Sequence, residues 1–330
     1  QVGLEMLVET ARLWRSLGHH DVDGRFNIDG VTGPDEYSAI TDNNIYTNLM
    51  AQQNLVAAAD LAGKYMDEAT ALGVTTEEAA AWRDAAGSMV IPYDERLCVH
   101  PQAERFTDHA RWDFEHTPPE NYPLLLHYPY FDLYRKQVVK QADLVLAMHL
   151  RGDAFTPEQK ARNFAYYEAL TVRDSSLSAC TQSVIAAEVG YLELAHDYLA
   201  EAALMDLHDV QHNTRDGLHM ASLAGAWTAL VGGFGGMRMR DDTLAFAPRL
   251  PSGISRLNFR LRYRGRRISV SINRTEARYE LLEGEPMPLI HHGELFTLED
   301  KPLVCEVPQI QAGPPPHQPA HRAPVTHITS

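Results

Sequence analysis

Residues 33–48 begin with Gly33-Pro-Asp-Glu-Tyr37 and continue through Asp42-Asn-Asn44 to Asn48. The Gly-Pro pair predicts a rigid turn, and the Asp-Asn-Asn run predicts the cap of a helix that follows it. The turn therefore presents two adjacent carboxylates, Asp35 and Glu36, on a fixed loop that a ligand can reach. A solvated turn followed by an ordinary helix cap is the alternative interpretation.

On both sides of this stretch, from residue 1 to about 240, the chain has the pattern of a helical protein. Between residues 45 and 59, apolar residues recur at steps of three and four. Capping boxes are predicted at Thr75–Glu78 and Thr156–Gln159, the second with proline at the first helical position. Further long helical patterns begin near Phe131, Ser176, Tyr191 and Ser222.

Residues 1–14 have the pattern of an amphipathic helix that is already under way. The chain starts with Gln1, and neither an initiator methionine nor a charged-then-apolar signal sequence precedes the helix. We expect this sequence to be the later part of a longer chain.

The longest segment without a helical pattern runs from about residue 91 to 128. Loops of this length in compact domains are usually functional or act as lids. The segment contains several histidines and the aromatic residues Trp112, Phe114, Tyr122 and Tyr128. These rings could stack on a sugar face, or they could pack the loop onto the protein.

Near residue 241 the apolar period changes from helical to alternating. Residues 257–263 and 268–272 alternate on either side of Arg264-Gly265, which predicts a β-hairpin with one buried face. Residues 277–281 continue the alternation. We predict a small, sandwich-like β domain over residues 241–311, followed by a disordered Pro- and His-rich tail over residues 312–330.

Composition places the chain among soluble globular proteins. It has 330 residues, of which 45% are hydrophobic and 22% charged. The net charge of −15 argues against nucleic-acid binding, and no apolar run of about 18 residues predicts a membrane span. The three cysteines show neither zinc spacing nor a disulfide framework, which suits a reducing cytoplasm.

Three further segments carry polar groups suited to a sugar or an anion. Residues 136–143 have a helical pattern that places Lys136 and Lys140 on one face. Together with Gln141, these lysines could hold vicinal hydroxyls, or the segment could be an exposed polar face. Ser175 and Ser176 open a predicted helix, whose free N–H groups offer an anion site. An ordinary helix cap is the alternative.

The third segment, residues 216–227, places His219 and Ser222 after a glycine turn. Both side chains can donate to a phosphate oxygen, whereas a satisfied structural histidine is the alternative. The glycine run Gly232–Gly236 lacks the strand-turn-helix context of a nucleotide loop. We predict that it permits close backbone packing where two domains meet.

Taken together, these motifs resemble glycoside hydrolase family 65, the family of the inverting phosphorylases of maltose, trehalose and kojibiose. The resemblance rests on Gly33–Tyr37 with Asp42–Asn48, on Lys140–Asp143, on Asp174–Ser178 and on Gly217–Trp227, in that order. It implies a mainly α fold, the later half of an (α/α)6 barrel over residues 1–240, followed by the family's C-terminal β domain.

The resemblance also implies an enzyme that cleaves an α-linked glucose disaccharide with inorganic phosphate, giving β-glucose 1-phosphate and glucose. Glu36 would be the general acid, kept protonated by burial or by the neighbouring Asp35 charge. Lys140 and Gln141 would hold the glucosyl ring. No metal or other cofactor is expected. The implied phosphate-binding residues are Ser175, Ser176, His219 and Ser222.

Two other functions stay open at this stage. An inverting hydrolase would need a second carboxylate roughly 6.5–9.5 Å from the acid, and Asp174, Glu188 and Asp216 are available. A non-catalytic sugar-binding or scaffold protein on the same fold is an alternative of another class. Members of the family are often dimers, so a homodimer is the assembly to test. The chain on its own is expected to be poorly soluble or partly unfolded, and inactive.

Overall fold

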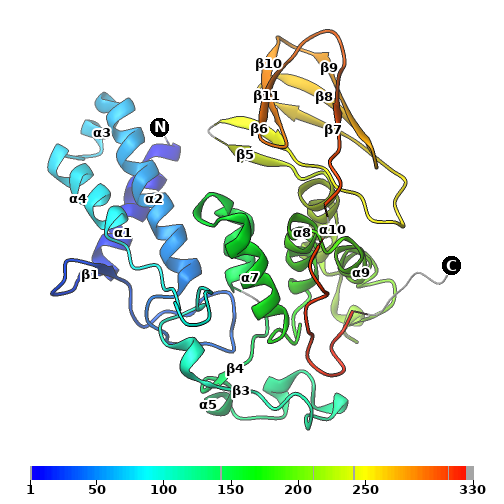
Figure 1. The fold of residues 1–330 in the computed structure, drawn as a ribbon. Helices are drawn as coiled ribbons and strands as arrows, with labels where there is room; N and C mark the ends of the chain where they lie inside the picture. The colour runs from blue at the N-terminus through cyan, green and yellow to red at the C-terminus, as the bar shows by residue number, and fades with distance from the viewer. Residues whose placement is uncertain (1, 142, 211, 241, 311, 325–330) are drawn as a thin grey trace. The chain divides into compact units, whose positions relative to one another are not determined.

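The computed structural model describes residues 2–141, 143–210, 212–240, 242–310 and 312–324. The chain divides into two compact units, Gln1–Asp174 and Ser175–Ser330. Figure 1 colours the first unit from blue to green and the second from green to red. Among the described residues, every helix is too short or too polar to cross a membrane.

The first unit is mainly helical, with short strands and long connections. Its α-helices are α1 (Val2–Leu17), α2 (Ile45–Lys64), α3 (Met66–Ala71), α4 (Thr76–Gly87), α5 (Tyr130–Leu133), α6 (Asp143–Leu150) and α7 (Pro157–Glu168). Its short strands are β1 (His19–His20), β2 (Phe26–Asn27), β3 (Ala110–Arg111) and β4 (Lys136–Gln137). Its 3-10 turns are η1 (Phe106–Asp108), η2 (Pro119–Asn121), η3 (Leu124–Leu126) and η4 (Gly152–Ala154).

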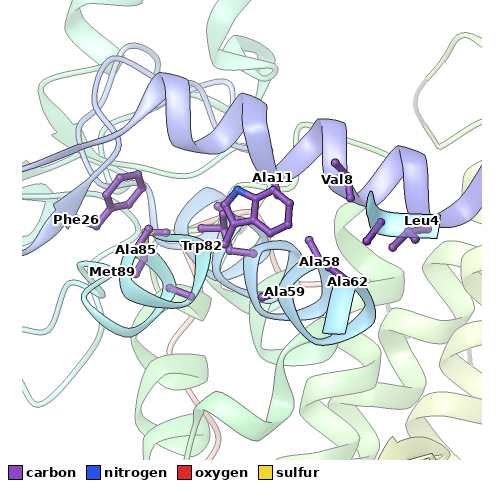
Figure 2. Packing of buried hydrophobic residues seen from close by; sticks show 14 of the residues in the cluster. Leu4, Val8, Ala11, Phe26, Ala58, Ala59, Ala62, Trp82, Ala85 and Met89 are labelled. Atoms are coloured by element: carbon purple, nitrogen blue, oxygen red, sulfur yellow. The ribbon is translucent and has the colours of Figure 1, made fainter. Parts of the chain in front are cut away.

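The core of the first unit forms where α1, α2 and α4 pack together. Buried Leu4, Val8 and Ala11 follow the helical period along α1. The α2 face opposite is built of alanines and leucines, which lets the helices approach closely. Trp82 of α4 is 1% exposed, and Figure 2 shows its indole ring in the middle of this cluster. The predicted amphipathic N-terminal helix is confirmed.

The helix starts predicted at Asn44, Thr75 and Thr156 are confirmed by their capping bonds. Asn44 accepts from the Thr47 N–H at 3.0 Å and caps α2. Thr156 forms a full capping box with Gln159 at the start of α7. Thr75 accepts from the Glu78 N–H at 3.1 Å, while the Glu78 carboxylate binds Arg12 of α1. That carboxylate therefore ties two helices together.

The long connection between α4 and α5 is also confirmed, and it contains only short turns and the two-residue β3. Its aromatic rings pack the loop onto the protein. They lie against a second buried cluster formed by Tyr37, Leu124, Leu133, Val138 and Val172. The rings in this contact are those of Trp112, Phe114, Tyr122 and Tyr128.

The helical pattern predicted for residues 136–143 is wrong, because residues 136–139 are extended. β4 pairs in parallel with β3, and Val139 exchanges backbone hydrogen bonds with Leu170 and Val172. The β-branched Val138-Val139 pair favours this conformation. Lys136 and Lys140 therefore do not share a helix face. The pattern near Phe131 gives only α5, a single turn that ends before this extended segment.

The second unit begins with helices and ends with strands. Its helices are α8 (Ser178–Val189), α9 (Leu192–Ala203), the 3-10 turn η5 (Thr214–Asp216), α10 (Met220–Thr228) and the π-helical η6 (Ala229–Phe234). Three of them start within two residues of the predicted positions. A small buried cluster of Ala179, Tyr198 and Ala202 joins α8 to α9.

The C-terminal strands form two four-stranded sheets, with the orders β11-β10-β6-β5 and β12-β9-β8-β7. The strands are β5 (Arg238–Arg240), β6 (Thr243–Phe246), β7 (Arg256–Tyr263), β8 (Arg266–Asn273), β9 (Glu276–Glu283), β10 (Met287–His291), β11 (Glu294–Leu298) and β12 (Leu303–Glu306). The predicted hairpin is β7–β8, with Tyr263 opposite Arg266. Phe246 of one sheet packs 5.2 Å from Tyr279 of the other, ring centre to ring centre. The β-rich C-terminal domain is confirmed.

The glycine run allows close packing inside the second unit. A Cβ on Gly233 would lie 3.3 Å from Val184 Cα of α8, and one on Gly236 would lie 2.3 Å from Ala247 O. The helices and the β strands of the second unit therefore come close to each other at Gly232–Gly236. In the predicted tail, Gln318 donates to the Tyr198 hydroxyl at 3.0 Å. Residues 325–330 of the tail lie outside the described residues.

Candidate active site

The loop that carries Glu36 is closed at its base. Val31 and Thr41 exchange two backbone hydrogen bonds of 2.9 and 2.8 Å. Residues 32–40 therefore form a defined loop immediately before α2, as predicted. Within it, the two adjacent carboxylates face different surroundings, because Asp35 is fully buried and the Glu36 side chain is 58% exposed.

The Asp35 carboxylate lies among neutral donors. It accepts from Gln102 Nε2 and from the Lys140 N–H at 2.8 Å each, and from the Tyr37 N–H at 3.2 Å. Burial raises the pKa of Asp35 to about 6, and these hydrogen bonds act in the opposite direction. Asp35 thus anchors Lys140 by its backbone.

A second buried carboxylate, Asp143, lies at the start of α6. It accepts from the Asp35 N–H and, at 2.6 Å, from Asn44 Nδ2. Burial, and then the charge of Asp35, raises the pKa of Asp143 well above its usual value. Asn44 therefore caps α2 with its oxygen and binds Asp143 with its nitrogen.

Glu36 and Lys140 form an ion pair on the exposed side of the loop. The Lys140 side chain is 17% exposed, and the neighbouring Gln141 donates from Nε2 to Pro34 O at 2.5 Å. The structure thus brings Lys140 and Gln141 to the Glu36 loop, although they lie more than 100 positions later in the chain. The Glu36 side chain is not buried in this structure. Burial, which was one of the two causes expected to keep its carboxyl group protonated, therefore does not apply here.

Tyr37 and Asp174 connect the loop to the long connection. The Tyr37 hydroxyl donates to Asp174 Oδ2 at 2.8 Å and accepts from the Leu125 N–H at 3.1 Å. Asp174 also accepts from the Leu124 N–H at 2.9 Å. Burial raises the pKa of Tyr37, and the nearby Asp174 carboxylate adds to this effect. The hydroxyl therefore stays a donor.

The residues predicted to bind phosphate lie in the second unit. Ser175 and Ser176 are half-buried just before α8, and Ser175 Oγ accepts from the Leu177 N–H at 3.3 Å. His219 lies just before α10, and its side chain is 17% exposed. The fully buried Ser222 hydroxyl donates to Ala202 O at 3.0 Å.

Asp206 is a functional candidate that the sequence did not reveal. Its carboxylate binds both His219 Nδ1, at 2.6 Å, and the His219 N–H, at 3.0 Å. This bidentate contact fixes the imidazole ring and directs Nε2 away from Asp206. Asp206 lies 13 positions before His219 in a turn after α9, with no motif around it.

The carboxylates considered as hydrolytic bases have other contacts. Asp174 accepts the two bonds described above. Glu188 forms an ion pair with Arg238 at 2.6 Å, and Asp216 lies in the exposed η5 turn with 73% of its side chain accessible. Glu188 is thus engaged in joining α8 to β5.

Comparison with known protein families supports the resemblance of the motifs. The glycosyl hydrolase family 65 central catalytic domain matches residues 1–228. The C-terminal domain of the same family matches residues 237–298. The chain therefore belongs to glycosyl hydrolase family 65.

Known relatives cover nearly all of this chain. An uncharacterized glycosyl hydrolase of Mycobacterium leprae is 58% identical over 330 residues, which are 99% of this chain and 41% of that protein. An α,α-trehalose phosphorylase of Geobacillus stearothermophilus is 44% identical, over 91% of this chain and 40% of that protein. The chain thus spans about two fifths of the length of these relatives.

A solved structure has a similar fold. It is titled "Putative kojibiose phosphorylase from human microbiome", and its TM-score with this chain is 0.83 at 29% sequence identity. The match covers 92% of this chain and 43% of the solved one.

Proposed function

We propose that the complete natural protein containing this chain cleaves an α-linked glucose disaccharide by inverting phosphorolysis. The products are β-glucose 1-phosphate and glucose. Among trehalose, maltose and kojibiose, α,α-trehalose is the first substrate to test, because the Geobacillus relative with 44% identity is an α,α-trehalose phosphorylase. We also propose that the helices of residues 1–240 form part of an (α/α)6 barrel.

The observation that carries this proposal is the ion pair between Glu36 and Lys140. A sugar whose hydroxyls bind Lys140 and Gln141 has its glycosidic oxygen within reach of the Glu36 carboxyl group. Glu36 then protonates that oxygen as the bond breaks, which is general acid catalysis. The sugar hydroxyls take the place of the carboxylate as partners of Lys140.

Phosphate is already an anionic nucleophile, so the proposed reaction needs donors in place of a second catalytic carboxylate. His219 donates from Nδ1 to Asp206, and in its imidazolium form, with both ring nitrogens protonated, it also donates from Nε2 to a phosphate oxygen. Ser175, Ser176 and the N–H groups at the start of α8 supply further donors. Ser222 joins this set only by turning its hydroxyl away from Ala202 O.

Inverting hydrolysis is the second candidate, and the contacts of Asp174 and Glu188 disfavour these two as its general base, which leaves the exposed Asp216. A general base must be able to accept a proton from water. Asp174 already accepts two hydrogen bonds, and Glu188 is paired with Arg238. A non-catalytic sugar-binding protein is the third candidate. The paired Glu36 and Lys140, together with a positioned His219, argue against it.

The test supplies the complete natural protein with trehalose, maltose or kojibiose, with and without inorganic phosphate. We expect β-glucose 1-phosphate to form only when phosphate is present. Glucose release at the same rate without phosphate would favour the hydrolase.

The role of Glu36 is tested by Glu36→Gln, which keeps the size of the side chain and removes the acid. We expect kcat to fall by about 10²–10⁴-fold. Glu68→Gln, an exposed change on α3, is the matched control and should keep the wild-type rate. An unchanged rate in Glu36→Gln would exclude Glu36 as the acid.

A further inference from the structure

Two buried carboxylates, Asp35 and Asp143, lie next to each other under the exposed Glu36–Lys140 pair. Both are fully buried, and the donors that bind them are neutral amide groups. Burying carboxylates without a cation partner costs free energy. Their presence at this point of the chain therefore suggests a role beyond packing.

Each carboxylate binds the backbone of one of the two segments that carry the ion pair. Asp143 accepts from the N–H of Asp35, the residue immediately before Glu36. Asp35 accepts from the N–H of Lys140 itself. The two buried bonds thus join the loop and the segment before α6 at the positions from which the Glu36 and Lys140 side chains extend.

The surroundings leave these bonds little freedom. Asn44 binds Asp143 while capping α2, so the helix start is part of the same arrangement. A Cβ on Gly33 would lie 2.2 Å from Asp143 Oδ2, which shows how closely the loop backbone approaches this carboxylate. Gln102 holds Asp35 on its other oxygen.

We propose that Asp143, acting through the Asp35 N–H, and Asp35, acting through the Lys140 N–H, are positioning residues that fix Glu36 and Lys140 relative to each other. This inference rests on the proposed function, in which Glu36 is the acid and Lys140 binds the sugar. A displacement of about 1 Å between a catalytic group and its substrate can lower the rate on the order of 100-fold.

The first test is Asp143→Asn in the complete natural protein, with kcat and KM measured per folded molecule on the disaccharide that the enzyme uses. The new amide has one acceptor oxygen for two donors, so its NH₂ group faces either the Asn44 Nδ2 or the Asp35 N–H, and the resulting donor–donor contact displaces the loop. We expect kcat to fall on the order of 100-fold and KM to change much less, because Lys140 stays bound to Asp35.

The rescue variant exchanges the two groups, Asn44→Asp together with Asp143→Asn. The exchange restores a donor facing an acceptor, and an aspartate at position 44 can still cap α2. We expect most of the lost kcat to return. Asp67→Asn on α3, which is exposed, is the control and should behave as wild type. A purely structural role predicts a lower melting temperature with unchanged kcat and KM per folded molecule, and that result would overturn the proposal.

Amide hydrogen exchange provides a readout that does not need activity. In the peptide covering residues 33–37, we expect faster exchange in Asp143→Asn than in the wild type, and slower exchange again in the rescue variant. Unchanged exchange in Asp143→Asn would also overturn the proposal. An inactive wild type with this exchange pattern would contradict the proposed function, while still supporting the role of Asp143 and Asp35 in holding the loop and the Lys140 segment together.

If Asp143→Asn does not fold, Asn44→Ser serves as a milder change. Serine caps a helix about as well as asparagine but removes the bond to Asp143 Oδ2. We expect a kcat loss on the order of 10-fold, with the α2 cap preserved. Wild-type kcat in this variant would contradict the proposal.

Discussion

Gly33 shows how tightly the loop is built, and it gives a direct prediction. An alanine Cβ at this position would lie 2.2 Å from Asp143 Oδ2 and 2.5 Å from Asn44 Nδ2, both of which are buried. We expect Gly33→Ala to lower the free energy of unfolding by about 1–3 kcal/mol. Chemical denaturation of the two proteins measures the difference.

Gly63→Ala is the matched control for this change. Gly63 lies within α2, and its Cβ would meet no atom within 4 Å. Gly63 is the second-last residue of α2, so only part of the roughly 0.5–1 kcal/mol by which a helix interior favours alanine over glycine applies, and this variant should be at least as stable as the wild type. Equal effects of the two substitutions would show that Gly33 is not tightly packed.

Asp35 makes stability depend on pH in an unusual direction. Burial raises the pKa of Asp35 to about 6 from its ordinary value of 3.8, so between these two pH values the folded protein binds more protons than the unfolded chain. Stability from this group is therefore lost as pH rises from about 4 to 6. We expect the wild type to lose about 2 kcal/mol relative to Asp35→Asn over this range.

The measurement is chemical denaturation of both proteins at several pH values between 4 and 7. Asp35→Asn is tolerable because Gln102 can turn its amide to accept from the new NH₂ group. Taking the difference between the two proteins removes the contribution of carboxylates far from Asp35, and it reports Asp35 together with Asp143, whose pKa is raised by burial and then by the Asp35 charge. A difference that stays constant with pH would show that Asp35 is not the group that titrates.

At the residue scale, sequence motifs indicated Glu36, Lys140 and Gln141, and the structure brings these three together. The bond from the Asp35 N–H to Asp143 joins positions 108 apart, and no local pattern encodes such a contact. Asp206 was missed for the same reason, because its role depends on a turn that returns the chain to His219.

At the element scale, helix starts could be predicted because caps are local. The Thr156–Gln159 capping box is an example, and it gives a third prediction. We expect Thr156→Ala to destabilise the protein by about 1 kcal/mol, because the first turn of α7 loses an acceptor.

Thermal or chemical unfolding measures this loss, with Thr76→Ala as the control. Thr76 is the exposed first residue of α4 and makes no capping bond to a helix N–H, so its replacement should change stability by less than about 0.5 kcal/mol. If the Thr156→Ala protein were as stable as this control, the capping box at Thr156–Gln159 would not contribute to the stability of the protein.

The segment at residues 136–141 shows where local patterns fail. Its charged and amide side chains fit a helix, yet the backbone is extended because β3 and residues 170–172 supply hydrogen-bond partners. Tertiary contacts outweigh propensity there. The extended backbone still places Lys140 beside Glu36, through the bond from the Lys140 N–H to Asp35. The helical interpretation did not include this bond.

At the scale of the whole molecule, the β7–β8 hairpin was predictable, whereas the pairing of the sheets was not. β6 and β10 run parallel, with Leu244 opposite Leu289. Such pairs need a long crossover, so alternation within each strand does not reveal them.

A fourth prediction concerns the chain of residues 1–330 expressed alone. Helix α1 exposes four large apolar side chains, those of Val2, Met6, Leu13 and Leu17. We expect this chain to unfold over a broad transition, to aggregate readily and to show no turnover. Calorimetry and the phosphate-dependent assay test this, and a sharp transition with normal activity would contradict it.

The short strand β5 has a consequence for anyone exchanging the C-terminal module between relatives. Arg238–Arg240 pairs with β6, so the sheet already includes residues ahead of the point near 241 where alternation becomes visible. In a hybrid joined at residue 241, the edge strand β5 would come from the relative that supplies the helices, while the rest of its sheet would come from the other relative. Hybrids joined upstream of Arg238 keep that strand with its own sheet.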